Sequence, residues 1–429
     1  MECSPVKRGM VFLLVLGFCF LQCGRKQEGT FYREEGNLYL SEGDYIQAAE
    51  TLKKAISRDP NDAKAHYGLG IAYMQLDNSS GAMKEFRKAI QIDPNFPHAH
   101  ASLGLVYLRM GMPEEALREC LHAVNIDSTF AEGYFRLGYV YAQQNKLDAA
   151  IKAYKKGLAL NPEEAHAHYR LGLVYMQQHR DDLAAEEFRE AIDIDPGHPY
   201  AHYNLGRIYF KQGKEAEGEK ELENFRKLRA YSEEATRLEN ALYKTQGAIS
   251  DEERASAHRD LGLVYWKWGK AAEAIREFKK AIRVDPGYAA AYYSMGVVYF
   301  HQENYKEAEE AFKTALRLQP DHMFARHNLG VIYYLKGSYK KAEQEIKKAV
   351  EGDSNLAVAH QSLGNVYLKQ GRLSEAIREY ETAVAMDSNN AGFRWTLGRA
   401  YLKAGRRTEG EKELLISRKL RKRNETSAD

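Results

Sequence analysis

A charge excess of either sign is absent from this 429-residue chain, because 62 lysines and arginines face 60 aspartates and glutamates. This balance argues against a protein that binds nucleic acid mainly by neutralising phosphates. Only 4 cysteines are present, which excludes a disulfide-dense scaffold. The hydrophobic fraction of 44% excludes disorder throughout the chain. Tryptophan is scarce, with 3 residues, whereas tyrosine is abundant, with 29, and this surplus requires an explanation.

The N-terminal apolar run, Met10 to Leu21, is only 12 residues long. As a helix it would span about 18 Å, well short of the hydrocarbon core of about 30 Å, so a stable transmembrane anchor is disfavoured. Lys7 and Arg8 precede the run and polar residues follow it, which is the layout of a secretory signal peptide. We therefore expect residues 1–22 to be a signal peptide that directs export.

Cys23 ends this segment, and the arrangement resembles a bacterial lipoprotein signal. The resemblance implies that Cys23 becomes the lipidated first residue, that residues 23–28 form a short tether, and that the protein sits on the periplasmic side of a bacterial membrane. The sequence departs from the usual pattern, because Phe20 and Gln22 stand where Leu and a small residue are expected. Processing at Cys19, cleavage without lipid and an uncleaved anchor stay open.

Glycine recurs every 34 residues in two series, and a fixed period of this length indicates a repeat protein. If this glycine is numbered position 8, six repeats cover 29–232, five cover 255–424, a 22-residue insert covers 233–254, and 425–429 is a tail. The glycines are Gly36, Gly70, Gly104, Gly138, Gly172 and Gly206, then Gly262, Gly296, Gly330, Gly364 and Gly398.

Other positions recur with the same period. Position 11 is Tyr in all eleven repeats, and position 20 is Ala in nine of them and Gly in two. Each repeat holds two stretches with apolar residues at helical spacing, such as 101–107 and 116–124. The pattern resembles the tetratricopeptide repeat (TPR) family over about nine-tenths of the chain. The resemblance implies an all-α fold, a right-handed TPR superhelical solenoid of about eleven helix-turn-helix repeats.

Residues 217–222 recur without change as 409–414, in the sixth and eleventh repeats. These helices carry charge where an interior helix would meet its neighbour, as the ends of a solenoid require. We therefore expect two arrays, 29–232 and 255–424, each with a cap-like last repeat. Apolar spacing predicts that the sixth repeat's second helix continues to about Tyr243, and Ser250 with Glu253 predicts a capping box that starts the next helix. The insert 233–254 is either an extra packed helix or a hinge.

Motifs of enzyme chemistry are lacking, since neither a phosphate-binding Gly-rich loop nor a His-Glu-x-x-His pattern occurs. Six histidines share position 4, the usual aromatic position of the family, which favours helix packing over metal binding. Cys120 stands at position 24, where other repeats have Phe, so we expect a buried side chain and not a nucleophile. The sequence thus predicts a protein that is not an enzyme and needs no metal and no cofactor.

In the family, positions 2, 5, 9, 12 and 13 of the first helix line a concave groove. In this sequence those positions hold ten lysines and arginines but one acid, Glu132, and many aromatics. The resemblance therefore implies a groove for peptides or partner proteins, preferably acidic ones with apolar anchors, and not for nucleic acid. The candidate residues are Arg33, Lys64, Tyr67, Arg109, Phe135, Tyr139, Tyr169, Tyr203, Arg207, Lys211, Arg259, Lys267, Tyr293, Trp395 and Arg399.

These features predict an interaction scaffold for envelope assembly, secretion or surface-appendage biogenesis. The alternative is an accessory subunit of a glycan-handling or polysaccharide-export enzyme complex, because tyrosine-rich grooves suit sugars as well as peptides.

Overall fold

The computed structural model describes residues 26–244 and 249–426. The predicted signal peptide and the candidate lipidation site Cys23, with its alternative Cys19, lie outside the described residues. The described residues form helices and turns and contain no strand, which confirms the predicted all-α fold. The chain divides into two compact units, Met1–Ala230 and Tyr231–Asp429, which are treated separately below.

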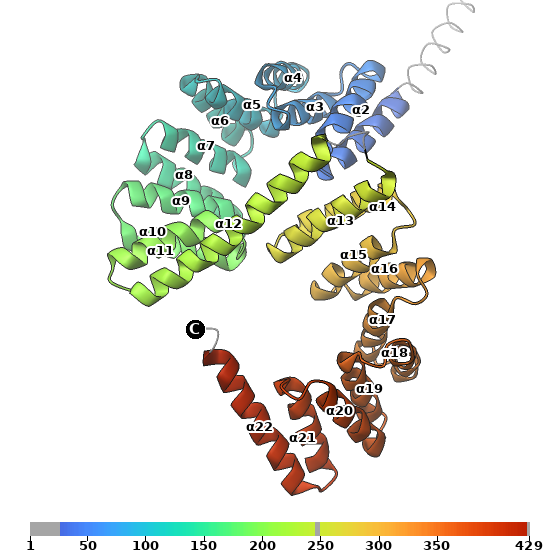
Figure 1. Cartoon of the computed structure of the whole chain (residues 1–429). Helices are drawn as coiled ribbons and strands as arrows, with labels where there is room; N and C mark the ends of the chain where they lie inside the picture. The colour runs from blue at the N-terminus through green and yellow to red at the C-terminus, as the bar shows by residue number, and fades with distance from the viewer. Residues whose placement is uncertain (1–25, 245–248, 427–429) are drawn as a thin grey trace, which may run out of the picture. The chain divides into compact units, whose positions relative to one another are not determined.

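The first unit is a row of helical hairpins that follow one another along the chain (Figure 1). In the second to fifth repeats a first helix of 13 residues pairs with a second helix of 14 residues. A helical segment, 26–41, precedes the labelled helices. These are α2 (Tyr45–Arg58), α3 (Ala63–Gln75), α4 (Ser79–Ile92), α5 (Pro97–Arg109), α6 (Pro113–Ile126), α7 (Ala131–Gln143), α8 (Leu147–Leu160), α9 (Ala165–Gln177), α10 (Asp181–Ile194) and α11 (Pro199–Lys211).

Helix α12 (Glu215–Lys244) continues beyond the sixth repeat and crosses the boundary between the two units. Its length confirms the prediction that this helix continues to about Tyr243. The second unit then contains α13 (Asp251–Lys267), α14 (Ala271–Val284), α15 (Ala289–His301), α16 (Tyr305–Leu318), α17 (Met323–Leu335), α18 (Tyr339–Gly352), α19 (Ala357–Lys369), α20 (Leu373–Met386), α21 (Ala391–Lys403) and α22 (Arg407–Thr426). The predicted capping box at the start of α13 is present between Ser250 and Glu253. No helix among the described residues has both the length and the apolar character needed to cross a bilayer.

The turn between the two helices of a repeat has the same backbone conformation in every copy. Position 15 has a positive φ throughout, as at Gly111 (φ 74°) and Gly371 (φ 81°). Glycine fills most of these turns because it adopts this region without steric cost. Asp77, Asn145, His179 and Glu303 hold the same conformation with φ between 55° and 59°. The two helices of each hairpin are therefore joined by a short turn of fixed geometry.

The repeated glycine at position 8 lets the two helices of a hairpin meet closely. A Cβ added at Gly172 would lie 2.7 Å from a ring carbon of Phe188, and one at Gly104 would lie 2.6 Å from Sγ of Cys120. Both partners stand at position 24 and are fully buried. The side chain at position 24 therefore fills the space that the missing Cβ leaves, which explains the glycine period of 34 residues.

Tyrosine at position 11 lies where neighbouring repeats meet. Tyr107 and Tyr175 are buried in the hydrophobic core of the first unit. Cations lie within 6 Å of the centroids of both rings. The Arg87 guanidinium is 5.6 Å from the Tyr107 ring centroid and donates a hydrogen bond of 2.8 Å to its hydroxyl. The tyrosine surplus thus has a structural role between successive hairpins.

The histidines at position 4 are buried or half-buried, but each also makes a polar contact that packing alone did not predict. Their Nδ1 atoms lie 2.5–2.8 Å from a glutamate at position 23 on the second helix of the same repeat. In five of the six, Nε2 faces a backbone carbonyl in the turn before the repeat. The pairs are His66–Glu85, His100–Glu119, His168–Glu187, His202–Glu221, His258–Glu277 and His360–Glu379.

The two positions vary together within the chain. Arg326 and Arg394 replace histidine at position 4 and still reach glutamates, Glu345 and Glu413, at 3.0 and 2.6 Å. Where position 4 is tyrosine, as at Tyr134 and Tyr292, position 23 is a small residue, Ala153 or Ala311. The glutamate is therefore present only where a cation can pair with it, because a buried unpaired carboxylate is costly. No cluster of three or more His, Cys, Asp or Glu side chains suited to a metal ion occurs among the described residues.

The ion pair of His168 gives the stability of the first unit a pH dependence. Both partners of the ring, the Glu187 carboxylate and the Pro162 carbonyl, are acceptors, and they raise the pKa of His168 above its ordinary 6.5. The folded state therefore gains stability from this pair below about pH 6.5 and loses it as the pH rises through the higher folded pKa. His168→Arg, which copies Arg326, keeps the pair charged. We expect its melting temperature to rise relative to that of the native chain by about 1–3 °C between pH 6 and 8.5, whereas parallel melting curves would contradict this account.

Gly172→Ala should destabilise the first unit by about 1–3 kcal/mol, because the new methyl group collides with the Phe188 ring. The double variant Gly172→Ala with Phe188→Leu should therefore recover part of the loss in a double-mutant cycle measured by urea denaturation. Costs that simply add would show that the two side chains do not meet.

Candidate binding groove

Several consecutive first helices contact one another directly, as α3 with α5, α5 with α7 and α7 with α9 in the first unit, and α13 with α15 and α17 with α19 in the second. We call the surface that the first helices of a unit present its first-helix face. Candidate residues from Arg33 to Lys211 belong to the first unit, and those from Arg259 to Arg399 belong to the second. The candidate residues fall into three groups by their contacts.

Tyrosines at position 5 lie partly in the hairpin core. Tyr67, Tyr169 and Tyr293 each place the ring 5.7–5.9 Å from the phenylalanine at position 24 of the same repeat. The residue at position 34 covers a second side of each ring, with centroid separations of 4.4–5.0 Å. Burial raises the pKa of all three hydroxyls. These rings are thus fixed in place and offer only part of their surface to a partner.

Several candidate cations already have partners within the chain. Arg33 contacts the Asp62 carboxylate at 2.6 Å, Lys211 pairs with Asp181, and Arg259 contacts Asp260 at 2.8 Å. Arg109 donates a hydrogen bond of 3.1 Å to the Met74 carbonyl. The basic character predicted from the first-helix positions is therefore reduced by acids that come mostly from turns and second helices.

Other candidate side chains are exposed and form aromatic–cation pairs. Arg207 lies 5.6 Å from the ring of Tyr203, which packs in turn on Phe225. In the second unit Arg399 lies 4.9 Å from the ring of Trp395, whose exposed fraction is 39%. Lys64 and Lys267 are also exposed. Such pairs present a flat ring and a charge to the solvent at one place.

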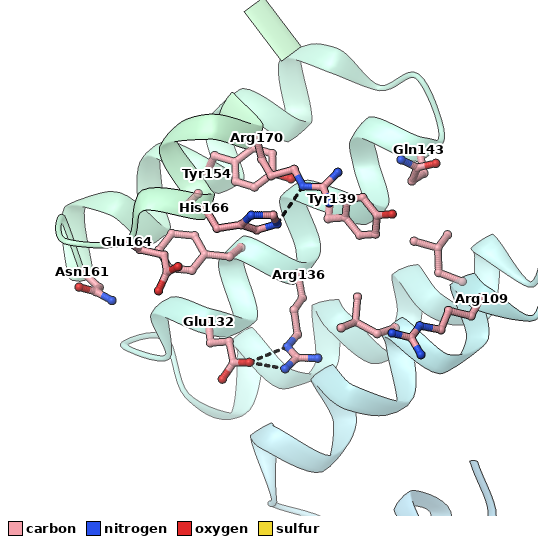
Figure 2. A pocket seen from close by; sticks show the side chains of 14 residues that line it. Arg109, Glu132, Arg136, Tyr139, Gln143, Tyr154, Asn161, Glu164, His166 and Arg170 are labelled. Carbon is pink, nitrogen blue, oxygen red and sulfur yellow. Dashed lines mark hydrogen bonds and ion pairs between the residues drawn. The ribbon is translucent and has the colours of Figure 1, made fainter. Parts of the chain in front are cut away.

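A pocket of about 750 Å³ opens on the first-helix face of the first unit, where α5, α7 and α9 meet (Figure 2). Three candidate residues line it, namely Arg109, Phe135 and Tyr139. Arg136 and Arg170, both at position 6, also line it, although position 6 was not among the expected groove positions. The sequence already distinguishes these two arginines, because position 6 is Gly, Ser, Asn, Asp, Thr or Glu in all of the remaining repeats.

Side chains within the pocket hold one another in place. Arg170 lies 4.8 Å from the Tyr139 ring and donates a hydrogen bond of 3.0 Å from Nε to Nε2 of His166, as Figure 2 shows. Burial and the Arg170 charge lower the pKa of His166 to about 4, so His166 is neutral at pH 7. Arg136 donates a hydrogen bond of 3.0 Å from Nε to the Glu132 carboxylate. The pocket therefore has a fixed arrangement of cations on an aromatic floor.

Cys120 does not provide a nucleophile. Its side chain is fully buried, and burial raises the pKa of the thiol to about 12. It packs beneath Gly104, as the other residues at position 24 do beneath their glycines. The prediction of a buried structural cysteine is confirmed.

The helical hairpins, their 34-residue period and the face of stacked first helices define a repeat solenoid. Models described as tetratricopeptide repeat match residues 135–199, 259–322 and 302–357, and residues 182–228. A model described as TPR repeat matches residues 36–77, 78–111 and 364–405. Together these matches span well over half of the chain, which belongs to the tetratricopeptide repeat family. Proteins of this family bind peptides or other proteins.

Solved structures similar to this chain include MamA, with 30% identity, 39% of this chain and 97% of MamA covered, and a TM-score of 0.35. PilF of Pseudomonas aeruginosa is 20% identical, with 48% of this chain and 99% of PilF covered and a TM-score of 0.43. YrrB, described as a TPR protein with an unusual peptide-binding site, is 28% identical, with 40% of this chain and 88% of YrrB covered and a TM-score of 0.32. No curated protein matches the sequence.

Proposed function

We propose that the protein is an exported, non-enzymatic scaffold that binds segments of partner proteins on its first-helix faces. The pocket between α5, α7 and α9 carries this proposal, because it combines three arginines with the aromatic rings of Phe135, Tyr139 and Tyr154. Arginine and aromatic side chains in a concave, partly desolvated site are the residues that contribute most to protein–protein binding.

The preferred partner segment is acidic and carries apolar side chains. Lys64, Arg207, Lys267 and Arg399 are exposed on the first-helix faces and are available to carboxylates of a partner. Exposed cations add to the rate of encounter and to specificity more than to final affinity, and salt screens them. The rings beside them, Tyr203 and Trp395, supply apolar surface.

The proposed organisation has two separately capped arrays, 29–232 and 255–424, so that each offers its own face to a partner. The N-terminal sequence supports export and attachment to a bacterial membrane by a lipid on Cys23. A role in envelope assembly, secretion or surface-appendage biogenesis fits a scaffold at that location.

Charge reversal on the faces tests the partner chemistry. Arg207→Glu and Lys267→Glu should each lower the amount of partner recovered from detergent-solubilised membranes by about 3- to 10-fold, because each change replaces an attraction by a repulsion. The salt sensitivity of capture should fall as well. Lys152→Glu, an equal charge change on the second helix α8, is the control and should leave capture unchanged. Mass spectrometry of the bound proteins gives the readout. Equal losses in all three variants, or none, would contradict a first-helix site, and recovery of glycan-handling enzymes would favour the accessory-subunit alternative.

Lipidation is tested with Cys23→Ser. We expect the native chain to incorporate labelled palmitate in a bacterial host and to fractionate with membranes, and the variant to lose the label and appear in the soluble fraction. Cys19→Ser is the matched control and should keep both properties. Label that follows Cys19 instead would place the processed residue there, and no label on either chain would contradict a lipid anchor.

A further inference from the structure

The pocket between α5, α7 and α9 contains two buried hydrogen-bonding atoms without a partner. One is the hydroxyl oxygen of Tyr154, whose side chain is 1% exposed, and the other is Nη1 of Arg136. Buried polar atoms in folded proteins nearly always have a partner, since an unsatisfied one costs about 1–3 kcal/mol. Both residues line one pocket, which indicates that a ligand completes their hydrogen bonds.

Tyr154 is unusual for its position in the repeat. Position 24 is apolar in nine repeats and tyrosine only at Tyr154 and Tyr380. In the second unit the Tyr380 hydroxyl donates a hydrogen bond of 2.8 Å to Oδ1 of Asn365, which stands at position 9 on the first helix. A hydroxyl at the tip of this ring therefore reaches the first-helix face. In the fourth repeat position 9 is Tyr139, and the Tyr154 hydroxyl has no such acceptor.

The ring of Tyr154 runs beneath Gly138, with ring carbons 3.0 Å from the site of a Cβ on that glycine. Burial raises the pKa of the Tyr154 hydroxyl, and the positive charge of Arg170, which lines the pocket, opposes this rise. Figure 2 shows Tyr154 beside Arg170, on the side of the pocket formed by α9. The unpartnered hydroxyl therefore belongs to the pocket and not to the interior of the hairpin.

Arg136 provides the second donor from a different helix. Its Nε and Nη2 atoms are both directed at the Glu132 carboxylate, which fixes the plane of the guanidinium and leaves Nη1 as the buried free donor. The Arg136 side chain is only 15% exposed. A partly buried guanidinium that is held by one carboxylate and has a free N–H can donate a hydrogen bond to a second carboxylate. Such a charge-assisted hydrogen bond is stronger than a neutral one.

We propose that this pocket binds a carboxylate that a partner peptide inserts between α5, α7 and α9, with Nη1 of Arg136 as its donor and the Tyr154 hydroxyl as a second contact to the inserted residue or its backbone. The apolar part of the inserted segment lies on Phe135 and Leu105, which line the same pocket. This inference rests on the proposed function, because it names the group that the scaffold recognises. An acidic side chain and the C-terminal end of a chain are two sources of the same carboxylate.

Small blocked peptides test the pocket on the full chain by ligand-observed NMR titration. The first pair is acetyl-Leu-Glu-Leu-amide and the same peptide with Gln in place of Glu, and the second pair is acetyl-Leu-Leu with a free C-terminus and its amide. A peptide with a carboxylate should bind about 10-fold more tightly than its neutral partner, which is the effect of a hydrogen bond to a charged group. The pair that shows the larger difference identifies the source, and equal binding within both pairs would overturn the proposal.

Substitutions then assign the donors. Arg136→Gln should remove the preference for the charged peptide, and Tyr154→Phe should weaken its binding by about 3- to 10-fold. Tyr380→Phe is the matched control at the same position, and it should leave binding unchanged. Thermal melting separates ligand binding from a structural role. Tyr154→Phe should melt no lower than the native chain because its hydroxyl has no partner, whereas Tyr380→Phe should melt lower because it loses the bond to Asn365. Unchanged peptide binding in Tyr154→Phe, or a lowered melting temperature for it, would overturn the role of the hydroxyl.

The outcome is distinguishable from a failure of the scaffold function. If partner capture depends on Arg207 and Lys267 but is the same in Arg136→Gln as in the native chain, the first-helix face binds partners and the pocket does not. If none of these variants changes capture, both the proposed function and the pocket inference fail.

Discussion

The contact between position 8 and position 24 is the constraint on which the other features depend. A glycine on the first helix allows the second helix to approach until the side chain at position 24 fills the space of the missing Cβ, as at Gly172 and Phe188. This contact fixes the distance between the two helices of a hairpin, and stacking of hairpins then forms a core that one repeat alone could not bury. Because both helices enclose the side chain at position 24, an aromatic ring there has almost no freedom to change its orientation. Whatever stands at the tip of that ring has a fixed place on the first-helix face.

A structural position can therefore acquire a functional atom with little change in packing. Phe188 and Tyr154 occupy the same place in adjacent repeats and differ by one hydroxyl group. In the tenth repeat, where Asn365 accepts from the Tyr380 hydroxyl, the polar atom is satisfied within the chain. In the fourth repeat it is directed at a pocket. The two repeats differ at position 9. Asn365 accepts the hydrogen bond of the Tyr380 hydroxyl, whereas Tyr139 accepts none from the Tyr154 hydroxyl.

Much of the fold was predictable because the sequence repeats. The helices, their pairing, the long α12 and the capping box at Ser250 all follow from periodicity and local signals, which act over a few residues and so survive without knowledge of the fold. The ion pairs between position 4 and position 23 were not predicted, because comparing one position at a time showed only histidines in an aromatic place. Comparing two positions together would have revealed them, as Tyr134 with Ala153 and His168 with Glu187 show.

The candidate site was predicted less well, and the reason is physical. The expected groove positions describe where a first-helix side chain begins, but not where a long side chain ends or what already pairs with it. Lys211 and Arg33 stand at expected positions and pair with Asp181 and Asp62, whereas Arg136 stands at an unexpected position and reaches the pocket. Positions that are uniform across the repeats report the packing that every hairpin needs. Positions that differ in one or two repeats report a requirement of those repeats alone, and the two arginines at position 6 together with the tyrosine at position 24 fall at one pocket. Residues that depart from the repeat pattern therefore lie together at one pocket. Their proximity, more than the average composition of the groove, supports the proposal that this part of the solenoid recognises a specific group.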